Sequence, residues 1–146
     1  MANTVSTRNP AQLTAMVVAV VFLVVGIAGF IPGLTTQYEG MKFAGQESTA
    51  MLLGVLCVSI LHNIVHLLFG IAGLALARTP GGAIQFLLVG GAIYAVLWLY
   101  GLLIDQSSAA NFVPVNDADN WLHLILAVAM IGLGLALRGR GVRRSV

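Results

Sequence analysis

Charged residues leave four long, mostly apolar stretches of the chain uninterrupted. Each stretch is long enough to cross a membrane as a helix, which takes about 20 apolar residues. None of them alternates apolar and polar residues over about ten positions, as the strands of a membrane barrel do. The pattern therefore predicts four helices, at about 12–31, 50–77, 83–104 and 120–137.

The composition supports a membrane protein. The 146 residues are 59% apolar and 8% charged, whereas a soluble domain has about 45–50% apolar and about 25% charged residues. So few charges cannot cover the surface of a soluble monomer, and the apolar content excludes a disordered chain. We therefore expect a single all-α domain over 1–146, an integral membrane four-helix bundle.

Prolines and the first apolar stretch agree with this prediction. Proline disrupts helix interiors, and all four prolines fall at predicted helix ends or between helices: Pro10, Pro32, Pro80 and Pro114. The apolar run at 15–31 exceeds the core of a signal peptide, which has about 7–15 residues. We expect it to be retained as a helix.

Basic residues set the expected orientation, because cytoplasmic segments of membrane proteins are enriched in Lys and Arg. Six of the seven basic residues fall on one predicted side: Arg8, Arg78, Arg138, Arg140, Arg143 and Arg144. The other side holds Lys42 and all five acids: Glu39, Glu47, Asp105, Asp117 and Asp119. We predict that both termini are cytoplasmic and that the tail at 138–146 contacts anionic lipid headgroups, not nucleic acid.

The positions of the aromatic residues and of the cysteine give further predictions for the outer half of the expected bundle. Four aromatic residues near the outer helix ends are typical of an interfacial belt: Tyr38, Trp98, Tyr100 and Trp121. Cys57 is the single cysteine, so no intrachain disulfide forms. We expect Cys57 to be a packed residue within the second helix.

Helical spacing places polar and small residues on one face of three helices. The stripe of the second helix is Ser59, His62, Asn63, His66, Gly70, Gly73 and Ala77. The third helix has Gly91, Tyr94, Trp98, Gly101 and Asp105, and the fourth has Asn120, His123, Ala127, Met130 and Gly134. Small residues let membrane helices approach closely, so we expect helix packing at Gly70, Gly73, Gly91, Ala127 and Gly134.

A short internal similarity links the second and fourth helices. The run Asn-Ile-Val-His-Leu at 63–67 matches Asn-Trp-Leu-His-Leu at 120–124. Two helix pairs that enter the membrane in the same orientation would form a parallel repeat. The similarity is short enough to arise by chance, so the repeat is one of two interpretations.

All three histidines fall within the predicted membrane helices, and ionisable groups inside membranes are functional candidates. One interpretation is a structural hydrogen-bond network with the asparagines. A second is a metal held by His62 and His66, one turn apart, or a haem with His123 opposite one of them. A third is a proton-relay or polar-ligand site. The candidate cluster is His62, Asn63, His66, Asp117, Asp119, Asn120 and His123.

Two further points bear on this cluster. Counted from the outer charges, His62 lies much deeper than His123, but counted from the inner arginines the two lie at nearly equal depth. The second helix must therefore tilt or protrude outside. Asp117 and Asp119 resemble part of a calcium loop but lack its glycine and distal glutamate. Helix capping at the start of the fourth helix is the simpler interpretation.

Two motifs carry a family resemblance. The segment Leu-His-Asn-Ile-Val-His-Leu-Leu-Phe-Gly-Ile-Ala-Gly-Leu at 61–74 is one, and Val-Asn-Asp-Ala-Asp-Asn-Trp-Leu-His at 115–123 is the other. With them, the chain resembles an actinobacterial family of small four-helix membrane proteins that is known as a domain of unknown function. The resemblance implies a multi-pass protein of the bacterial plasma membrane and carries no activity.

The sequence contains no nucleophile–base pair, phosphate-binding loop or Cys/His cluster, so we assign no catalytic residue. We expect a non-enzymatic accessory or interaction subunit of the cell envelope, with a membrane or envelope protein or a second copy as partner. No cofactor is predicted. The alternative is a bundle that binds a polar ligand, a metal or a haem, or relays protons, through its histidines.

Overall fold

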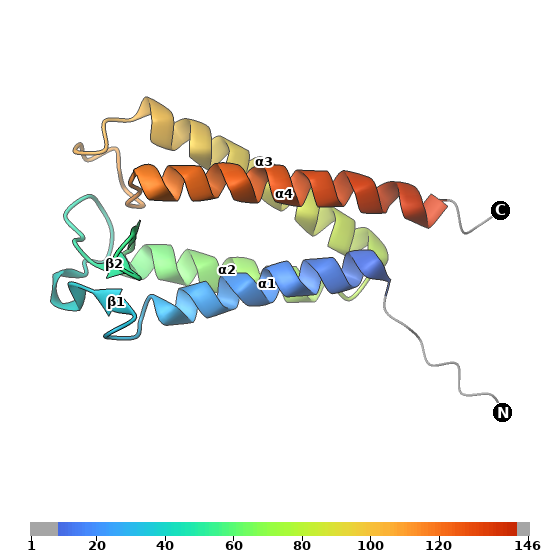
Figure 1. The fold of residues 1–146 in the computed structure, drawn as a ribbon, viewed down its shortest axis with the longest axis horizontal. Helices are drawn as coiled ribbons and strands as arrows, with labels where there is room; N and C mark the ends of the chain where they lie inside the picture. The colour runs from blue at the N-terminus through green and yellow to red at the C-terminus, as the bar shows by residue number, and fades with distance from the viewer. Residues whose placement is uncertain (1–8, 143–146) are drawn as a thin grey trace.

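Four helices make up most of the structure, a computed structural model that describes residues 9–142 (Figure 1). They are α1 (Pro10–Ala28), α2 (Ile60–Leu76), α3 (Pro80–Leu103) and α4 (Asp117–Val142). Three are long and apolar enough to cross a membrane: α1, α3 and the part of α4 at Asp117–Arg138. The fourth, α2, is apolar but shorter.

The helix ends carry the expected capping chemistry. Pro10 and Pro80 occupy the first turns of α1 and α3, where a missing N–H costs nothing. The Asn9 side chain accepts a hydrogen bond from Ala11 N, and Thr79 Oγ1 accepts one from Gly82 N at 3.0 Å. The predicted bounds of the first, third and fourth helices are therefore correct to within a few residues.

The prediction of a single helix over 50–77 is wrong in its first part. A three-stranded antiparallel sheet, β1 (Thr35–Thr36), β2 (Met51–Leu52) and β3 (Leu56–Cys57), occupies this region beside the short helix η1 (Tyr38–Gly40). Leu53 and Gly54 adopt positive φ angles of 53° and 71°, a left-handed conformation that no α-helix contains. Ser59 then caps α2 by accepting a hydrogen bond from His62 N at 3.1 Å.

The apolar residues of 50–58 pack on a small second core. Ala50, Leu52 and Val58 are buried there against the end of α1, including Val25 and Ala28. Their hydrophobicity therefore reflects a cap over one end of the helices. It also follows that Cys57 lies in β3 and not within a helix, which corrects the prediction for that residue.

The setting of Cys57 predicts an unreactive thiol. Burial raises the pKa of the Cys57 thiol to about 11, and the nearby carboxylate of Asp119 adds to the effect. About one thiol in a thousand is then ionised at pH 8, and the thiolate is the reactive form. We expect iodoacetamide to alkylate the folded protein at least about a hundredfold more slowly than the SDS-denatured chain. Rapid labelling of the folded protein at pH 8 would contradict this.

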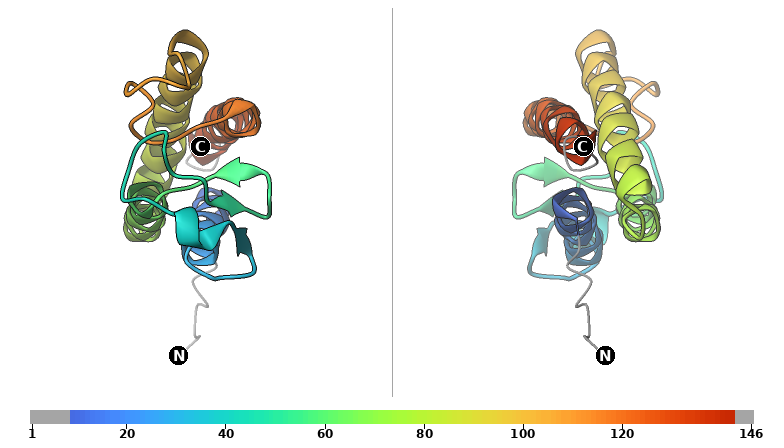
Figure 2. Two further views of the ribbon diagram at one scale, coloured as in Figure 1. Left: turned by 90° about the vertical axis from the view of Figure 1, so that its left-hand side faces the viewer. Right: turned by 90° about the vertical axis from the view of Figure 1, so that its right-hand side faces the viewer.

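The helices form two antiparallel pairs, α1 with α2 and α3 with α4 (Figures 1 and 2). The start of α1, the α2–α3 connection and the end of α4 lie at one end of the molecule. The sheet and the 104–116 connection lie at the other end, called the sheet end below. α3 leaves α2 at their short connection and runs obliquely away from it.

Small residues lie where the helices of each pair approach most closely. A Cβ atom on Gly70 of α2 would lie 2.8 Å from the backbone oxygen of Ala19 in α1. One on Gly91 of α3 would lie 3.1 Å from the backbone oxygen of Ala127 in α4. Gly73 contacts Ala19 and Phe86, and Gly134 contacts Leu87 and Leu88. All five residues predicted for helix packing thus lie at helix contacts.

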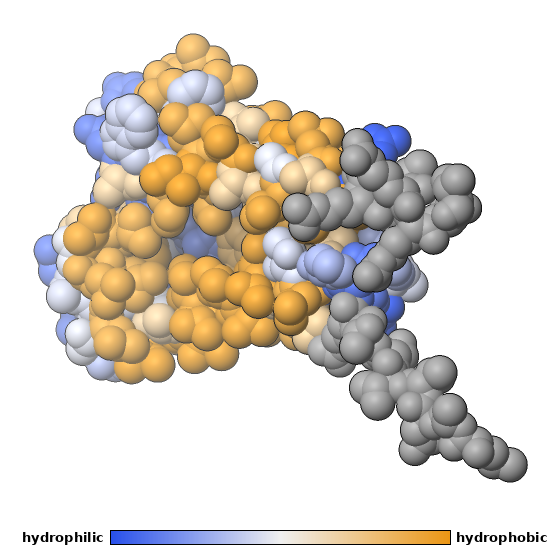
Figure 3. Space-filling model, turned by 45° about the vertical axis from the view of Figure 1, so that its right-hand side comes forward, coloured by the Kyte–Doolittle hydropathy of each residue, from blue (hydrophilic) through white to orange (hydrophobic). Residues whose placement is uncertain are grey.

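The outward faces of the helices are apolar. Figure 3 shows hydrophobic residues over most of one side, with hydrophilic residues gathered toward the two ends. Val17, Val24, Val128 and Leu135 are among the exposed large side chains. Such extended apolar surface is far beyond what a soluble monomer exposes, and it fits helices that face lipid.

Candidate functional site

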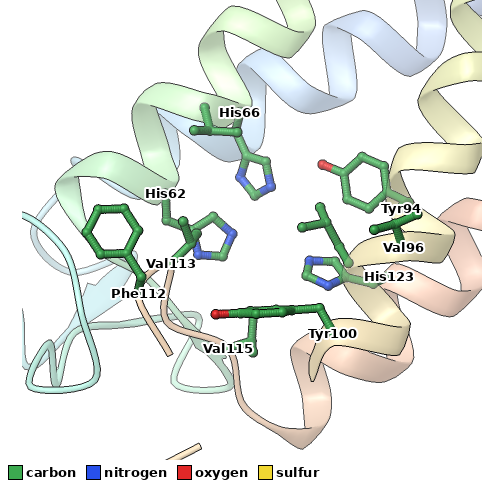
Figure 4. A pocket seen from close by; sticks show the side chains of 11 residues that line it. His62, His66, Tyr94, Val96, Tyr100, Phe112, Val113, Val115 and His123 are labelled. Carbon is green, nitrogen blue, oxygen red and sulfur yellow. The ribbon is translucent and has the colours of Figure 1, made fainter. Parts of the chain in front are cut away.

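A cavity of about 330 Å³ lies between α2 and α3 at the sheet end of the helices (Figure 4). Its size is within the roughly 300–1,000 Å³ of small-molecule sites. Its lining residues come from α2, α3, α4 and the 104–116 connection: His62, Val65, His66, Tyr94, Val96, Leu97, Tyr100, Phe112, Val113, Val115 and His123. The cavity, called the histidine cavity below, therefore gathers all three histidines.

The three imidazoles point toward the same space (Figure 4). His62, His66 and His123 are only 4%, 7% and 5% exposed. The rings of His62 and His66 have centroids 4.6 Å apart. Because α2 begins at Ile60, these two residues lie in its first turns, as His123 does in α4. This agrees with the depth counted from the inner arginines, and the extra length of the second apolar stretch is the sheet that precedes α2.

Each imidazole has a buried Nδ1 atom without a hydrogen-bond partner among the described residues. Buried polar groups in proteins are nearly always paired. An unpaired one costs about 1–3 kcal/mol. Three of the five such atoms among the described residues border this cavity; the other two, Asn63 Oδ1 and Asn120 Oδ1, lie at helix contacts outside it.

Aromatic rings close the inner end of the cavity. Phe22 of α1 and Tyr94 of α3 stack with centroids 5.3 Å apart and an interplanar angle of 25°. Phe22 lies 5.8 Å from the His66 ring, and Tyr94 lies 5.3 Å from the His123 ring. Phe69 contacts both aromatic rings edge-on. Among the described residues, the rings that follow this layer are Phe69 and Phe86, which are apolar.

The 104–116 connection closes the cavity at the sheet end. Asn111 orders it, because its side chain donates to the backbone oxygens of Gln106 and Val115 and accepts from Val115 N. The hydroxyl of Tyr100 donates to Ala110 O. Phe112 O accepts a hydrogen bond from Gly45 N at 2.7 Å. This connection is therefore fixed to α3 and to the loop between η1 and β2.

The side of the cavity between α2 and α3 stays open. Val96 on α3 is 64% exposed and Phe112 is 57% exposed, although both line the cavity. Val65 on α2 is also exposed. The opening therefore lies on the lateral face of the helices, beside the apolar outer surface.

The two asparagines of the predicted cluster do not line the cavity. Asn63 lies against Gly29 at the end of α1, where any Cβ would overlap its amide. Asn120 lies in the same way against Gly101 of α3 and donates to Gly101 O at 3.1 Å. Both asparagines are buried, and they fix helix pairs from inside.

These contacts form the same arrangement in each helix pair. In the α1–α2 pair, Phe22 packs against His66 and Gly29 packs against Asn63. In the α3–α4 pair, Tyr94 packs against His123 and Gly101 packs against Asn120. The spacing within each helix is identical in the two pairs. The helix caps match too, since Ser59 and Asn116 each precede their asparagine by one turn and accept from a backbone N–H. The structure therefore supports the interpretation of a parallel repeat.

The two aspartates have separate roles. Asp119 is 2% exposed, and its Oδ2 accepts hydrogen bonds from Cys57 N and Asn116 N, both at 3.0 Å. It thus caps α4 and attaches β3 to it. Asp117 is exposed and accepts one hydrogen bond from Gln106 at 3.1 Å. Neither carboxylate lines the histidine cavity.

The structure bears only partly on the predicted metal ligands and on the arginines predicted to contact lipid headgroups. Among the described residues, no group of three or more His, Cys, Asp or Glu side chains is placed to hold a metal ion. Of the four tail arginines, Arg138 is exposed on α4 and Arg140 lies in the last turns of that helix. Arg143 and Arg144, and Arg8 at the other end of the chain, lie outside the described residues.

Sequence reasoning missed several cavity residues. Val96, Phe112, Val113 and Val115 carry no chemical signal of their own, and three of them lie in a loop whose course depends on Asn111. For Phe22, by contrast, the sequence contains a signal. Its spacing to Gly29 repeats that of Tyr94 to Gly101.

Comparison with known proteins identifies a family without assigning an activity. No curated protein and no solved structure matches the chain. One family, described as "Domain of unknown function (DUF4383)", matches residues 12–136. This match spans all four helices and both histidine-bearing motifs. The chain therefore belongs to the DUF4383 family, whose function is unknown.

Proposed function

We propose that this chain is a multi-pass membrane protein that binds a lipophilic small molecule in the histidine cavity. The observation that carries the proposal is the combination of three buried imidazoles, each with an unpaired Nδ1 atom, and a lateral apolar opening between α2 and α3. Pockets with mostly apolar walls and a few convergent polar groups are typical ligand sites. A ligand that reached the imidazoles would supply hydrogen bonds that the protein lacks there.

In this proposal all four helices cross the bacterial plasma membrane. α2, with 17 residues, is about 26 Å long at 1.5 Å per residue, slightly less than the hydrocarbon core of about 30 Å. Trp98, Tyr100, Trp121 and Tyr38 lie toward the sheet end, which suits an interface on the outer side.

Reporter fusions test the orientation. The positive-inside rule places the end with Arg78 and Arg138 in the cytoplasm. We therefore expect a C-terminal alkaline phosphatase fusion to be inactive and a C-terminal green fluorescent protein fusion to be bright. Phosphatase inserted after Ser108, in the opposite connection, should be active. An active C-terminal phosphatase would contradict the orientation.

The geometry favours ligand binding over the other roles considered for the histidines. A structural network would join the imidazoles to other helices, but their Nδ1 atoms are unpaired among the described residues, and the polar interactions of His62 are with backbone groups of Pro114 and Cys57, outside the helices. A proton path would need polar groups past the stacked rings of Phe22 and Tyr94, which are followed by Phe69 and Phe86. The accessory-subunit hypothesis has no specific contact surface to support it and stays a prediction.

A substitution at the opening tests the proposal. Val96→Trp fills the lateral opening with a large side chain, so we expect the purified protein to lose its co-purifying lipophile by at least about tenfold. Val128→Trp is the matched control, because Val128 is 65% exposed on α4 and lines no described cavity. Mass spectrometry of organic extracts measures both. Equal retention by the two variants, or no lipophile with the wild-type chain, would overturn the proposal.

A further inference from the structure

We propose that the lipophile is a quinone with an apolar tail, and this inference rests on the function proposed above. The quinone head would lie between His66 and His123, and its tail would follow the seam between α2 and α3. Four properties of the cavity lead to this class: the hydrogen-bond donors, their arrangement, the absence of charge and the shape of the apolar groove.

The imidazoles present donors to the cavity. A neutral imidazole, the form favoured in apolar surroundings, has one N–H and one bare nitrogen. Nδ1 of His66 and of His123 is sealed from the cavity without a partner. The Nε2 atoms are not sealed, and no described residue bonds them. With the proton on Nε2, each imidazole would offer a ligand one N–H donor.

The same arrangement disfavours a metal or a haem. A histidine that ligates a metal through Nε2 carries its proton on Nδ1, and that N–H almost always has a protein partner. Here the Nδ1 atoms have none. The site suits a hydrogen-bond acceptor better than a Lewis acid.

The two donors are arranged as a pair. His66 and His123 occupy equivalent positions in the repeated helix pairs, each beside an aromatic ring of the partner helix, Phe22 or Tyr94. A flat ring with a carbonyl at each end offers two acceptors in a matching arrangement. The ring faces of Tyr94 and Tyr100 border the same space and suit a planar head (Figure 4).

The head must be uncharged. No Lys, Arg, Asp or Glu lines the histidine cavity. A carboxylate or phosphate there would be buried without a counter-charge, which costs far more than a neutral carbonyl does. This distinguishes a quinone from a fatty acid or a phospholipid headgroup.

The tail has a path along α3. A shallow apolar surface of α3, formed by Val89, Ala92, Ile93, Val96 and Leu97, adjoins the histidine cavity at its last two residues. A second cavity, of about 240 Å³, shares Val89 and Ile93 with this surface and reaches Gln85. The three together follow α3 from Val96 to Gln85, which is about 16 Å at 1.5 Å per residue. An isoprenoid or alkyl chain fits this shallow apolar groove.

Calorimetric titration of the purified full chain in mild detergent tests the inference. The probes are decylubiquinone and decylbenzene, which share a ten-carbon tail but differ in their heads. We expect decylubiquinone to bind at least about tenfold more tightly, since a buried hydrogen bond to each histidine contributes that much. An absorption spectrum and metal analysis accompany each preparation.

Substitutions that move the donor sharpen the test. Glutamine carries an N–H at about the position of Nε2, whereas asparagine carries one nearer Nδ1. We expect His66→Gln and His123→Gln to keep decylubiquinone binding within about threefold, and His66→Asn and His123→Asn to lose at least about tenfold. If the asparagine variants do not fold, the comparison of the two probes on the wild-type chain still decides.

The outcomes separate the two proposals. Equal binding of both probes that Val96→Trp abolishes would overturn the quinone and keep the lipophile site. Binding of neither probe would overturn both. A Soret band or stoichiometric metal in the wild-type preparation would overturn the quinone in favour of a haem or metal at the same histidines.

Discussion

Gly91→Leu is expected to lower the free energy of unfolding by about 3 kcal/mol or more, because overpacking a close helix contact forces backbone shifts. A Cβ at Gly91 would lie 2.7 Å from Ile131 Cγ1, 3.0 Å from Ile131 N and 3.1 Å from Ala127 O. Two of these atoms belong to the backbone of α4 and cannot rotate away. SDS titration of the purified protein, followed by circular dichroism, measures the loss.

Gly132→Leu is the matched control for this substitution. Gly132 lies on α4, and a Cβ built there meets nothing within 4 Å. Leucine is also a better helix former than glycine, so this variant should be as stable as the wild type or more so. If the two variants lost equal stability, the α3–α4 contact would not be the close packing described.

Asp119→Ala should cost about 2–3 kcal/mol, since it leaves two N–H groups without their acceptor. Those groups, Cys57 N and Asn116 N, belong to β3 and to the start of α4. The substitution therefore detaches the sheet from the helix and frees the cap. Hydrogen exchange should show the loss as faster exchange of the Cys57 amide.

Two further variants make this expectation specific. Asp117→Ala, on the same turn but exposed, should cost less than about 1 kcal/mol. Asp119→Asn keeps one acceptor oxygen and should fall between the two. Equal effects at both aspartates would mean that charge near the helix end matters and the specific hydrogen bonds do not.

The sequence predicts much of the helical structure, for a definable reason. Membrane helices are bounded by charges and prolines, and these mark α1, α3 and α4 closely. They fail for 50–59, where the chain is apolar because it packs on the small core of Ala50, Leu52 and Val58. The left-handed backbone at Leu53 and Gly54 makes the turn of this hairpin, and the cap at Ser59 starts the helix that follows.

The site is predictable in part for a similar reason. Helical periodicity assembles His62 and His66 on one face, because residues one turn apart must share it. Periodicity within one helix cannot decide which neighbour a residue meets, so Asn63 and Asn120 were grouped with the histidines although they face glycines. The 104–116 connection could not be placed, since its course depends on contacts with α3 and the sheet.

Photolabelling with a diazirine-bearing decyl lipophile tests most directly whether a ligand occupies the space between α2 and α3. The account predicts that labelling concentrates on the cavity lining, including Tyr94, Val96 and Phe112, and that excess unlabelled lipophile competes it away. Labelling of lipid-facing Val128 should not saturate. Label spread evenly over all exposed apolar residues, with no competition at Val96, would contradict the account.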